Sequence, residues 1–270
     1  MNRQATTDTK DALPDDLSFA AHIEEWYRQN GRDLPWRHTK DAYLIWLSEI
    51  ILQQTRVEQG RDYYTRFTEH YPTVWHLAQA PEDEVMRLWQ GLGYYSRARN
   101  LHKAAKQAVA NGHFPLSYDE LLTLPGVGRY TAAAIASFAY DEPQAVVDGN
   151  VYRVLARHAG ISTPIDSTAG AKEFAQLAQM RLDKHHSALY NQAIMDFGAI
   201  VCKPASPLCG ECPVADSCVA FAAGLVSTLP VKQHRTKLTE RFLTFVCVRN
   251  SDGLFLMQKR GQGDIYRGLY

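Results

Sequence analysis

The stretch Leu124–Asn150 constrains the fold of this chain more than any other. It opens with Leu-Pro-Gly-Val-Gly-Arg-Tyr-Thr, in which Pro125, Gly126 and Gly128 predict a tight turn. The alanine-rich segment after the turn is a strong helix former, and Tyr118–Leu124 before it predicts an incoming helix. The sequence therefore predicts two helices joined by a glycine-containing hairpin.

This hairpin offers a place for an anion such as a DNA phosphate. Gly126 and Gly128 let a ligand approach the backbone closely, and the amides that open the second helix at Arg129 lie at its positive dipole end. A Gly-x-Gly turn by itself is more often a packing turn between helices. The full octet, followed one helix later by Asp148-Gly-Asn150, favours a functional site.

The composition gives no sign of a nucleic-acid partner, because the 270 residues carry a formal net charge of zero. Local patches must supply any such surface. Met1–Asp16 is polar, so we expect no signal peptide, and no apolar stretch is long enough for a bilayer span. Four of the five cysteines crowd into one short segment, unlike a secreted disulfide framework. We therefore expect a reducing, cytoplasmic compartment.

Apolar residues at helical spacing predict further helices on both sides of the hairpin. Leu34–Arg37 is expected to be an extended connector. The expected helices are Leu17–Gln29, Asp41–Arg56, Gly60–His70, Glu82–Trp89, Arg97–Ala110, Val151–Ala159, Ala169–Met180 and Ser187–Ile200.

Glu49 is a carboxylate in the middle of an almost continuous apolar helix, where burial without a partner is expensive. For most helical glutamates, a solvent-facing position or an arginine partner is the commoner explanation. The residues one turn away, such as Ile45, Trp46 and Leu52, are mostly apolar, which favours a partly dry environment. Desolvation raises the pKa of a carboxyl group, as a general acid working near neutrality requires.

A second glycine-rich turn, Gly91-Leu-Gly-Tyr94-Tyr-Ser96-Arg97, opens the helix that follows it. Aromatic side chains beside glycine and arginine suit stacking on bases and binding of phosphate. A helix-to-helix turn with packed tyrosines would have the same composition, so this motif alone is only suggestive.

The cysteines follow the pattern Cys202-x6-Cys209-x2-Cys212-x5-Cys218. Four soft thiolates in so short a loop can enclose one metal centre. Tetrahedral zinc sites with four cysteines are common, but they usually use paired Cys-x2-Cys knuckles. Only one such pair occurs here, which favours an iron–sulfur cluster.

Together these motifs resemble the helix-hairpin-helix DNA glycosylases with a [4Fe–4S] cluster loop, the superfamily of endonuclease III. Within that group the chain is similar to the adenine DNA glycosylases of the MutY type, over roughly Leu17–Tyr270. The cysteine spacing, the hairpin with Val-Asp148-Gly-Asn150, and Ser-Glu49-Ile-Ile-Leu-Gln-Gln-Thr carry the resemblance.

The resemblance implies a mainly α fold in which two helical domains flank a DNA cleft. One domain would comprise residues 35–140, and the other residues 17–34 with 141–226, pinned by a structural cluster. A polar tail, residues 1–16, and a basic linker, residues 227–239, would lie outside them.

The last segment, residues 240–270, is expected to be an incomplete Nudix-like domain of the kind that reads 8-oxoguanine. Arg241–Val248 and Leu254–Gln258 predict two strands around an Asn250–Gly253 turn. Apolar residues such as Phe242 would lack a partner layer. We therefore expect a truncated chain that keeps catalysis but loses most discrimination between 8-oxoguanine and guanine.

The implied activity is the hydrolysis of adenine from double-stranded DNA in which it is mispaired with 8-oxoguanine or guanine. Glu49 would be the general acid that protonates the base at N7, and the carboxylate of Asp148 would stabilise the oxocarbenium-like sugar. Tyr130 and Asn150 would orient the intermediate and the attacking water. Family members that also cut the strand have a lysine where this chain has Tyr130, so the resemblance implies a monofunctional glycosylase. We also expect the protein to be a monomer.

The resemblance also indicates which residues would contact DNA from which the target base is flipped out. Gln54 and Tyr94 match positions that wedge into the gap opposite the target base. The complete expected DNA-binding set is Gln54, Arg56, Tyr94, Ser96, Arg97, Gly126, Gly128, Arg129 and Lys203. Two alternatives are an endonuclease III-like pyrimidine glycosylase and a non-catalytic, redox-sensing iron–sulfur protein that binds DNA. Glu49 and Tyr130 argue against the first, and the paired carboxylates against the second.

Overall fold

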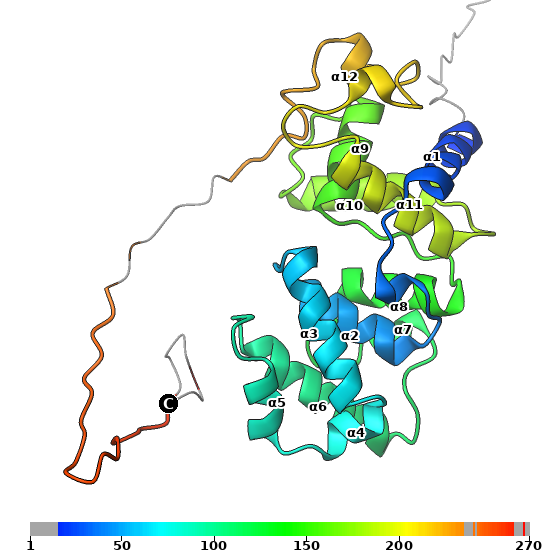
Figure 1. The fold of residues 1–270 in the computed structure, drawn as a ribbon. Coiled ribbons are helices and arrows are strands. Elements are labelled where there is room, and N and C mark those ends of the chain that lie inside the picture. The colour runs from blue at the N-terminus through cyan, green and yellow to red at the C-terminus, as the bar shows by residue number, and fades with distance from the viewer. Residues whose placement is uncertain (1–15, 235–239, 241, 262–266, 268–270) are drawn as a thin grey trace, which may run out of the picture. The chain divides into compact units, whose positions relative to one another are not determined.

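The computed structural model describes residues 16–234, 240, 242–261 and 267, and it divides into two compact units between Gln233 and His234. All helices of the described residues lie in the first unit (Figure 1). They are α1 Asp16–Asn30, η1 Pro35–Arg37, α2 Ala42–Leu52, α3 Val57–His70, α4 Val74–Gln79, α5 Glu82–Leu88, α6 Ser96–Ala110, α7 Tyr118–Leu121, α8 Arg129–Tyr140, α9 Gly149–Ala159, α10 Thr168–Arg181, α11 Ser187–Ile200, η2 Cys209–Glu211 and α12 Val219–Ala222. The predicted mainly helical fold is confirmed.

Two predicted helices are shorter than expected. The helix with Glu49 begins after Asp41, whose carboxylate accepts hydrogen bonds from two backbone amides of the first turn, but it ends at Leu52 instead of Arg56. Gln54 adopts a φ of 56°, which a right-handed helix does not allow. The incoming helix of the hairpin stops at Leu121 instead of Leu124.

The connector at Pro35–Arg37 is also different from the prediction. It forms a turn of 3-10 helix instead of an extended strand, with proline at its first position, where a fixed φ favours helical turns. The sequence pattern did not predict the short helices α4 and α12, since each is too brief to show helical periodicity.

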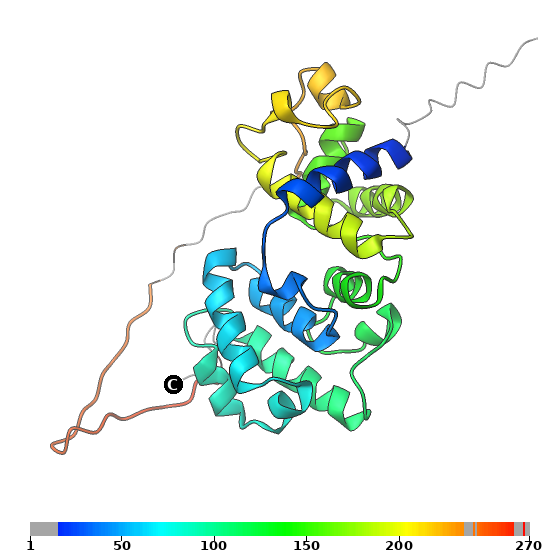
Figure 2. The ribbon, with the colours of Figure 1, turned by 45° about the vertical axis from the view of Figure 1, so that its right-hand side comes forward.

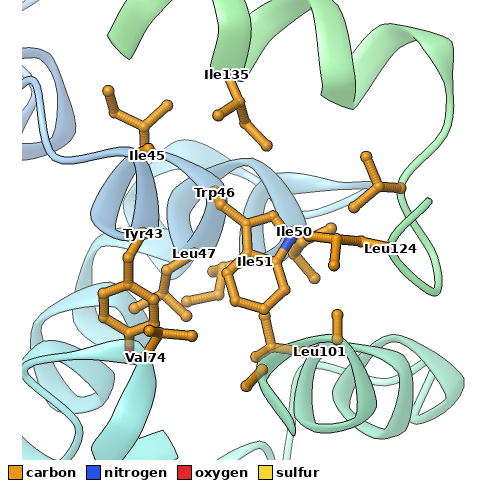
Figure 3. Close-up of a cluster of buried hydrophobic side chains, with 14 of the residues drawn as sticks. Tyr43, Ile45, Trp46, Leu47, Ile50, Ile51, Val74, Leu101, Leu124 and Ile135 are labelled. Carbon is orange, nitrogen blue, oxygen red and sulfur yellow. The ribbon is translucent and has the colours of Figure 1, made fainter. Parts of the chain in front are cut away.

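One hydrophobic cluster forms around α2, which is apolar on nearly all sides and is therefore buried on nearly all sides. Its side chains pack against α3, α4, α6 and α8. Figure 3 shows Trp46 and Leu47 of α2 between Ile135 of α8 and the residues Val74 and Leu101 on the other side. Glu49 therefore starts from the most enclosed helix of the molecule.

A second hydrophobic cluster joins α1 with α9, α10 and α11, and Figure 2 shows these four helices gathered away from α2. Its fully enclosed side chains include Ile23 of α1, Leu155 of α9 and Phe174 of α10. Asp148 stands at the first turn of α9. The two predicted catalytic carboxylates thus belong to helices of different clusters.

The second unit contains the predicted turn but not the predicted strands. Asn250 N–H donates to Leu254 O at 3.0 Å, and an isolated bridge joins Arg249 to Phe255. No regular strand forms among the described residues of this unit. Its described apolar side chains are solvent-exposed, 91% for Phe242, so no described residue of this unit forms a layer over them. Arg241 lies outside the described residues, and the Nudix-like assignment stays a prediction.

Among the described residues, no helix has the combined length and apolar character that crossing a bilayer requires.

Candidate active site

A cavity of about 220 Å³ lies in the first unit and is lined by residues on helices that contribute to both hydrophobic clusters. All four residues predicted to be catalytic line it. The lining comprises Arg32, Leu34, Trp36, Arg37, Ile45, Ser48, Glu49, Leu52, Thr55, Val57, Tyr130, Phe138, Asp148, Asn150, Gln192, Met195 and Ala199. The cavity therefore brings together Glu49 and Asp148, which are almost a hundred positions apart in the sequence.

The carboxyl group of Glu49 is held in a dry environment. The residue is 8% exposed on α2, and the hydroxyl of Tyr130 forms a side-chain hydrogen bond with it. Burial, with a smaller contribution from the charge of Asp148, raises the pKa of Glu49 to about 7, although Tyr130 and Arg37 act in the opposite direction. Near neutral pH this carboxyl group can therefore hold a proton and also release it.

Tyr130 follows Arg129 at the start of α8 and is enclosed by the same cavity. Burial and the charges of Glu49 and Asp148 raise the pKa of its phenol well above the ordinary value. The phenol therefore stays protonated and donates to Glu49.

Asp148 caps the N-terminus of α9 in extended backbone conformation. Its Oδ1 accepts from the backbone amides of Asn150 and Val151 at 2.8 and 2.7 Å, and its Oδ2 accepts from the side-chain amide of Asn150 at 2.8 Å. These bonds fix the carboxylate at the positive end of the helix dipole, facing the cavity.

Asn150 is held from a second side by Arg153. One guanidinium nitrogen of Arg153 donates to the side-chain oxygen of Asn150 at 2.8 Å and to Gly198 O at 2.6 Å, while Nε donates to Cys202 O at 2.6 Å. No local pattern in the sequence pointed to Arg153, which stands one turn after Asn150 on α9.

A buried ion cluster forms another wall of the cavity. Asp196 of α11 is fully buried and accepts from Arg32 at 2.5 and 2.9 Å and from Arg37 at 2.5 and 2.7 Å. Both arginines also line the cavity. No local pattern in the sequence pointed to these arginines as the partners of Asp196.

The four clustered cysteines surround a second, mainly apolar pocket. Among the described residues, only Glu24, Asp183 and His186 bring three ligand atoms within 4.8 Å of one another, so no three of the cysteine sulfurs all lie that close together. Four sulfurs around one tetrahedral zinc would be about 3.8 Å apart, as a Zn–S distance of about 2.3 Å dictates. The all-thiol donor set and its wider spacing fit a multinuclear iron–sulfur cluster better than a single zinc ion.

Arg157 of α9 attaches the cysteine loop to the helical body. Its guanidinium donates to Cys202 Sγ at 3.4 Å, to Lys203 O at 2.7 Å and to Pro204 O at 3.1 Å. The backbone around Lys203 is thereby fixed, and the side chain of this residue is half-buried.

The hairpin presents Gly126, Gly128 and Arg129 at the surface. Gly126 has a φ of 79°, and a Cβ there would lie 2.8 Å from the Cβ of Asn100, so packing demands glycine. At Gly128 a Cβ would meet nothing within 4 Å, and the φ of −98° suits any residue. Glycine at this position leaves open space in front of the first amides of α8.

The predicted wedge residues Gln54 and Tyr94 are both exposed and both have positive φ, 56° and 45°. Such strained conformations in residues other than glycine concentrate at functional sites. Arg56 and Ser96 are also exposed, close to them in the sequence.

Arg97 was predicted to bind DNA phosphate, and the structure gives it a different role. Its guanidinium is directed inward and donates to the carbonyls of Gln53 at 2.5 Å and Gly93 at 3.4 Å, and to Ile50, Ile51 and Leu92. These carbonyls terminate α2 and form the glycine-rich turn. Arg97 therefore holds the two loops of Gln54 and Tyr94 together, and its contact with DNA phosphate stays a prediction.

Comparison with known proteins identifies relatives across most of this chain. Residues 47–180 match the model of the HhH-GPD superfamily base excision DNA repair proteins. An adenine DNA glycosylase of Buchnera aphidicola subsp. Schizaphis graminum is 34% identical over 255 residues, which cover 93% of this chain and 73% of that protein. The adenine DNA glycosylase of Mus musculus is 44% identical over 232 residues, 81% of this chain but only 45% of the mouse protein. The chain therefore spans less than half the length of this mammalian relative.

Solved structures show the same fold. A thermostable thymine-DNA glycosylase aligns with a TM-score of 0.72 and 30% identity, covering 77% of this chain and 97% of that one. A non-covalent endonuclease III–DNA complex aligns with a TM-score of 0.65 at 23% identity, over 79% of this chain and 99% of its own. The chain belongs to the HhH-GPD superfamily of base excision DNA repair proteins and, within it, to the adenine DNA glycosylase family.

Proposed function

We propose that this protein is a monofunctional DNA glycosylase that hydrolyses adenine from double-stranded DNA in which adenine is mispaired with 8-oxoguanine or guanine. The observation that carries the proposal is Glu49, a carboxyl group with a pKa of about 7, facing Asp148 across one cavity. Family membership supplies the substrate class, since the relatives are named adenine DNA glycosylases.

Glu49 acts as the general acid in this proposal. Adenine leaves the sugar poorly as an anion, so a ring nitrogen, N7, must be protonated as the bond breaks. The buried carboxyl group holds a proton near neutral pH, and the hydrogen bond from Tyr130 fixes its orientation.

Asp148 stabilises the sugar as positive charge develops on it. Its carboxylate is preorganised by the bonds from the α9 amides and from Asn150, so no reorganisation is needed during the reaction. Asn150 then holds the attacking water with Asp148, and Arg153 and Gly198 restrict Asn150 to one orientation.

The composition of the cavity supports the proposed absence of strand cleavage. A lyase step needs an amine that forms an imine with the opened sugar. None of the described residues that line the cavity is a lysine, and Tyr130 occupies the position where bifunctional relatives have one. Tyr130→Lys should therefore introduce borohydride-trappable adducts and strand cleavage. A folded variant that traps no DNA would contradict the proposed position of Tyr130 beside the sugar.

The DNA would be held by backbone amides at Gly126, Gly128 and Arg129, with Gln54 and Tyr94 inserted where the base leaves the stack. Exposed Arg56 and Ser96 and half-buried Lys203 would contact the phosphates. A single chain supplies every group named here, so we propose a monomer. DNA as substrate and the four unpaired cysteines favour action in the cytoplasm, at the nucleoid.

The cysteines Cys202, Cys209, Cys212 and Cys218 would hold a [4Fe–4S] cluster. When bound, the cluster supplies a rigid covalent frame for the loop and the possibility of redox response. The chain's own residues, Arg153 and Arg157, transmit that rigidity to the start of α9 through their bonds to Cys202.

One observation favours a second candidate, since the thymine-DNA glycosylase shares 30% identity and nearly its full length with this chain. Single-turnover assays on duplexes with A:8-oxoguanine, A:G and T:G pairs separate the two functions. The proposal predicts adenine release from the first two, with strand breaks only after heating in alkali. Release of thymine, or breaks without alkali, would contradict it.

A further inference from the structure

The connection between α10 and α11 lies against α1 at a cluster of three possible metal ligands. Glu24 comes from the middle of α1, whereas Asp183 and His186 precede the first turn of α11. One ligand atom from each residue lies within 4.8 Å of the other two. None of these residues belongs to the catalytic cavity or to the cysteine loop.

Glu24 makes this cluster more than an acidic patch. Its side chain is only 6% exposed, and Oε2 accepts from Arg28 at 3.3 Å. Its other oxygen, Oε1, is buried and receives no N–H donor from any described residue; the neighbour it can share a proton with is the carboxyl group of Asp183. A buried carboxylate oxygen without a donor is costly, so it indicates a missing positive partner.

The surroundings of Glu24 increase this need. The carboxyl group lies against the carboxyl group of Asp183, and burial followed by the charge of Asp183 raises the pKa of Glu24. Asp183 is itself engaged by His186, whose Nδ1 lies 2.9 Å from Oδ2. A cation between the three groups would satisfy Oε1 and remove the repulsion between the two carboxylates.

We propose that Glu24, Asp183 and His186 form a binding site for a divalent transition-metal ion that ties α1 to the α10–α11 connection. Two carboxylate oxygens and one imidazole nitrogen suit Mn²⁺ or Zn²⁺, and water molecules would complete the coordination. The side chain of His186 is 64% exposed, so an ion and its waters can enter from solvent.

The site is tested with Mn²⁺, because manganese prefers oxygen and nitrogen to the thiolates of the cysteine loop. The full chain with its cluster is titrated with Mn²⁺ while electron paramagnetic resonance reports the free ion. We expect about one Mn²⁺ per chain, with Glu24→Gln and His186→Gln each weakening binding at least about tenfold. The matched controls are Glu25→Gln and His185→Gln, neighbours outside the cluster, which should bind like the wild type.

Thermal denaturation gives a second readout that does not depend on excision activity. Mn²⁺ should raise the melting temperature of the wild type and of both controls, because an ion that binds only the folded chain stabilises it. It should not raise that of Glu24→Gln or His186→Gln. Equal Mn²⁺ binding by all five proteins, or none by the wild type, would overturn the proposed site. A proton shared between Glu24 and Asp183 would then explain their close approach.

Discussion

At the scale of single residues, the burial that gives Glu49 its proposed role should also lower the free energy of unfolding at a pH where Glu49 is ionised. Burial raises the pKa of this carboxyl group from 4.5 to about 7, so the folded protein binds the proton more tightly than the unfolded chain. Stability from this group is therefore fully present below pH 4.5 and is lost as the pH rises through about 7.

Glu49→Gln removes this pH dependence. At pH 8 we expect the variant to be more stable than the wild type by an amount on the order of 2–3 kcal/mol, with little difference at pH 4.5. Denaturation at both pH values measures the difference, with exposed Glu69→Gln as the control. If Glu49→Gln destabilised the protein at pH 8, the carboxylate would have to be paired in a way the structure does not show.

Asp148 combines a structural role with the proposed catalytic role, and two substitutions separate them. Asp148→Asn keeps the oxygen that caps the helix but places an N–H donor opposite the side-chain amide of Asn150, so it should cost about 1 kcal/mol of stability while adenine release falls by at least about a hundredfold. Asp148→Ala should lose the cap as well, at a cost of about 1 kcal/mol. Single-turnover rates and melting temperatures of both variants check this prediction. Adenine release by Asp148→Asn at a rate near that of the wild type would show that the charge of Asp148 is not needed for catalysis.

At the scale of elements, the two glycines of the hairpin are expected to have different roles, Gly126 in packing and Gly128 in DNA binding. Gly126→Ala should destabilise the protein by about 1–3 kcal/mol, because of its positive φ and the close contact with Asn100. Gly128→Ala adds a methyl group to open space, so it should cost less than about 1 kcal/mol yet weaken DNA binding. Affinity for a non-cleavable duplex and thermal stability test the pair. A Gly128→Ala variant with unchanged affinity would show that no phosphate lies there.

The sequence predicted the long helices well, since an apolar stripe over three or more turns has few alternatives. Ser187–Ile200 was predicted with the bounds that the structure shows. The same periodicity extended the helix of Glu49 four residues too far. A periodic pattern cannot show that Arg97, more than forty positions away, donates hydrogen bonds to the carbonyls at the end of α2.

The candidate site was predicted to a similar degree. Local patterns pointed to Glu49 and Asp148, and the family resemblance pointed to Tyr130. Arg37 and Arg153 have no such pattern. Their roles come from contacts with Asp196 and Cys202, and long-range pairing of this kind is a property of the fold.

At the scale of the whole molecule, the cysteine loop and the catalytic cavity share α9. Arg153 contacts Asn150 on one side and Cys202 O on the other. If the cysteine loop holds the proposed cluster, the start of α9 should lose its order when the cluster is removed.

We expect the purified protein to be brown and to contain about four irons per chain. Cys212→Ala should lose the iron and melt at a lower temperature, whereas Cys247→Ala, which removes the exposed fifth cysteine, should change neither. Iron analysis and visible absorption make the comparison. A colourless wild type with one zinc per chain would refute the cluster.

The central claim is that Glu49 delivers the proton that releases adenine. The most direct measurement is single-turnover release of adenine from an A:8-oxoguanine duplex by the wild type and by Glu49→Gln, alongside the affinity of each for the same duplex. We predict that the variant binds DNA like the wild type but releases no adenine, and that the wild-type rate falls as the pH rises above about 7, where Glu49 loses its proton. Adenine release by Glu49→Gln at a rate near that of the wild type would contradict the account.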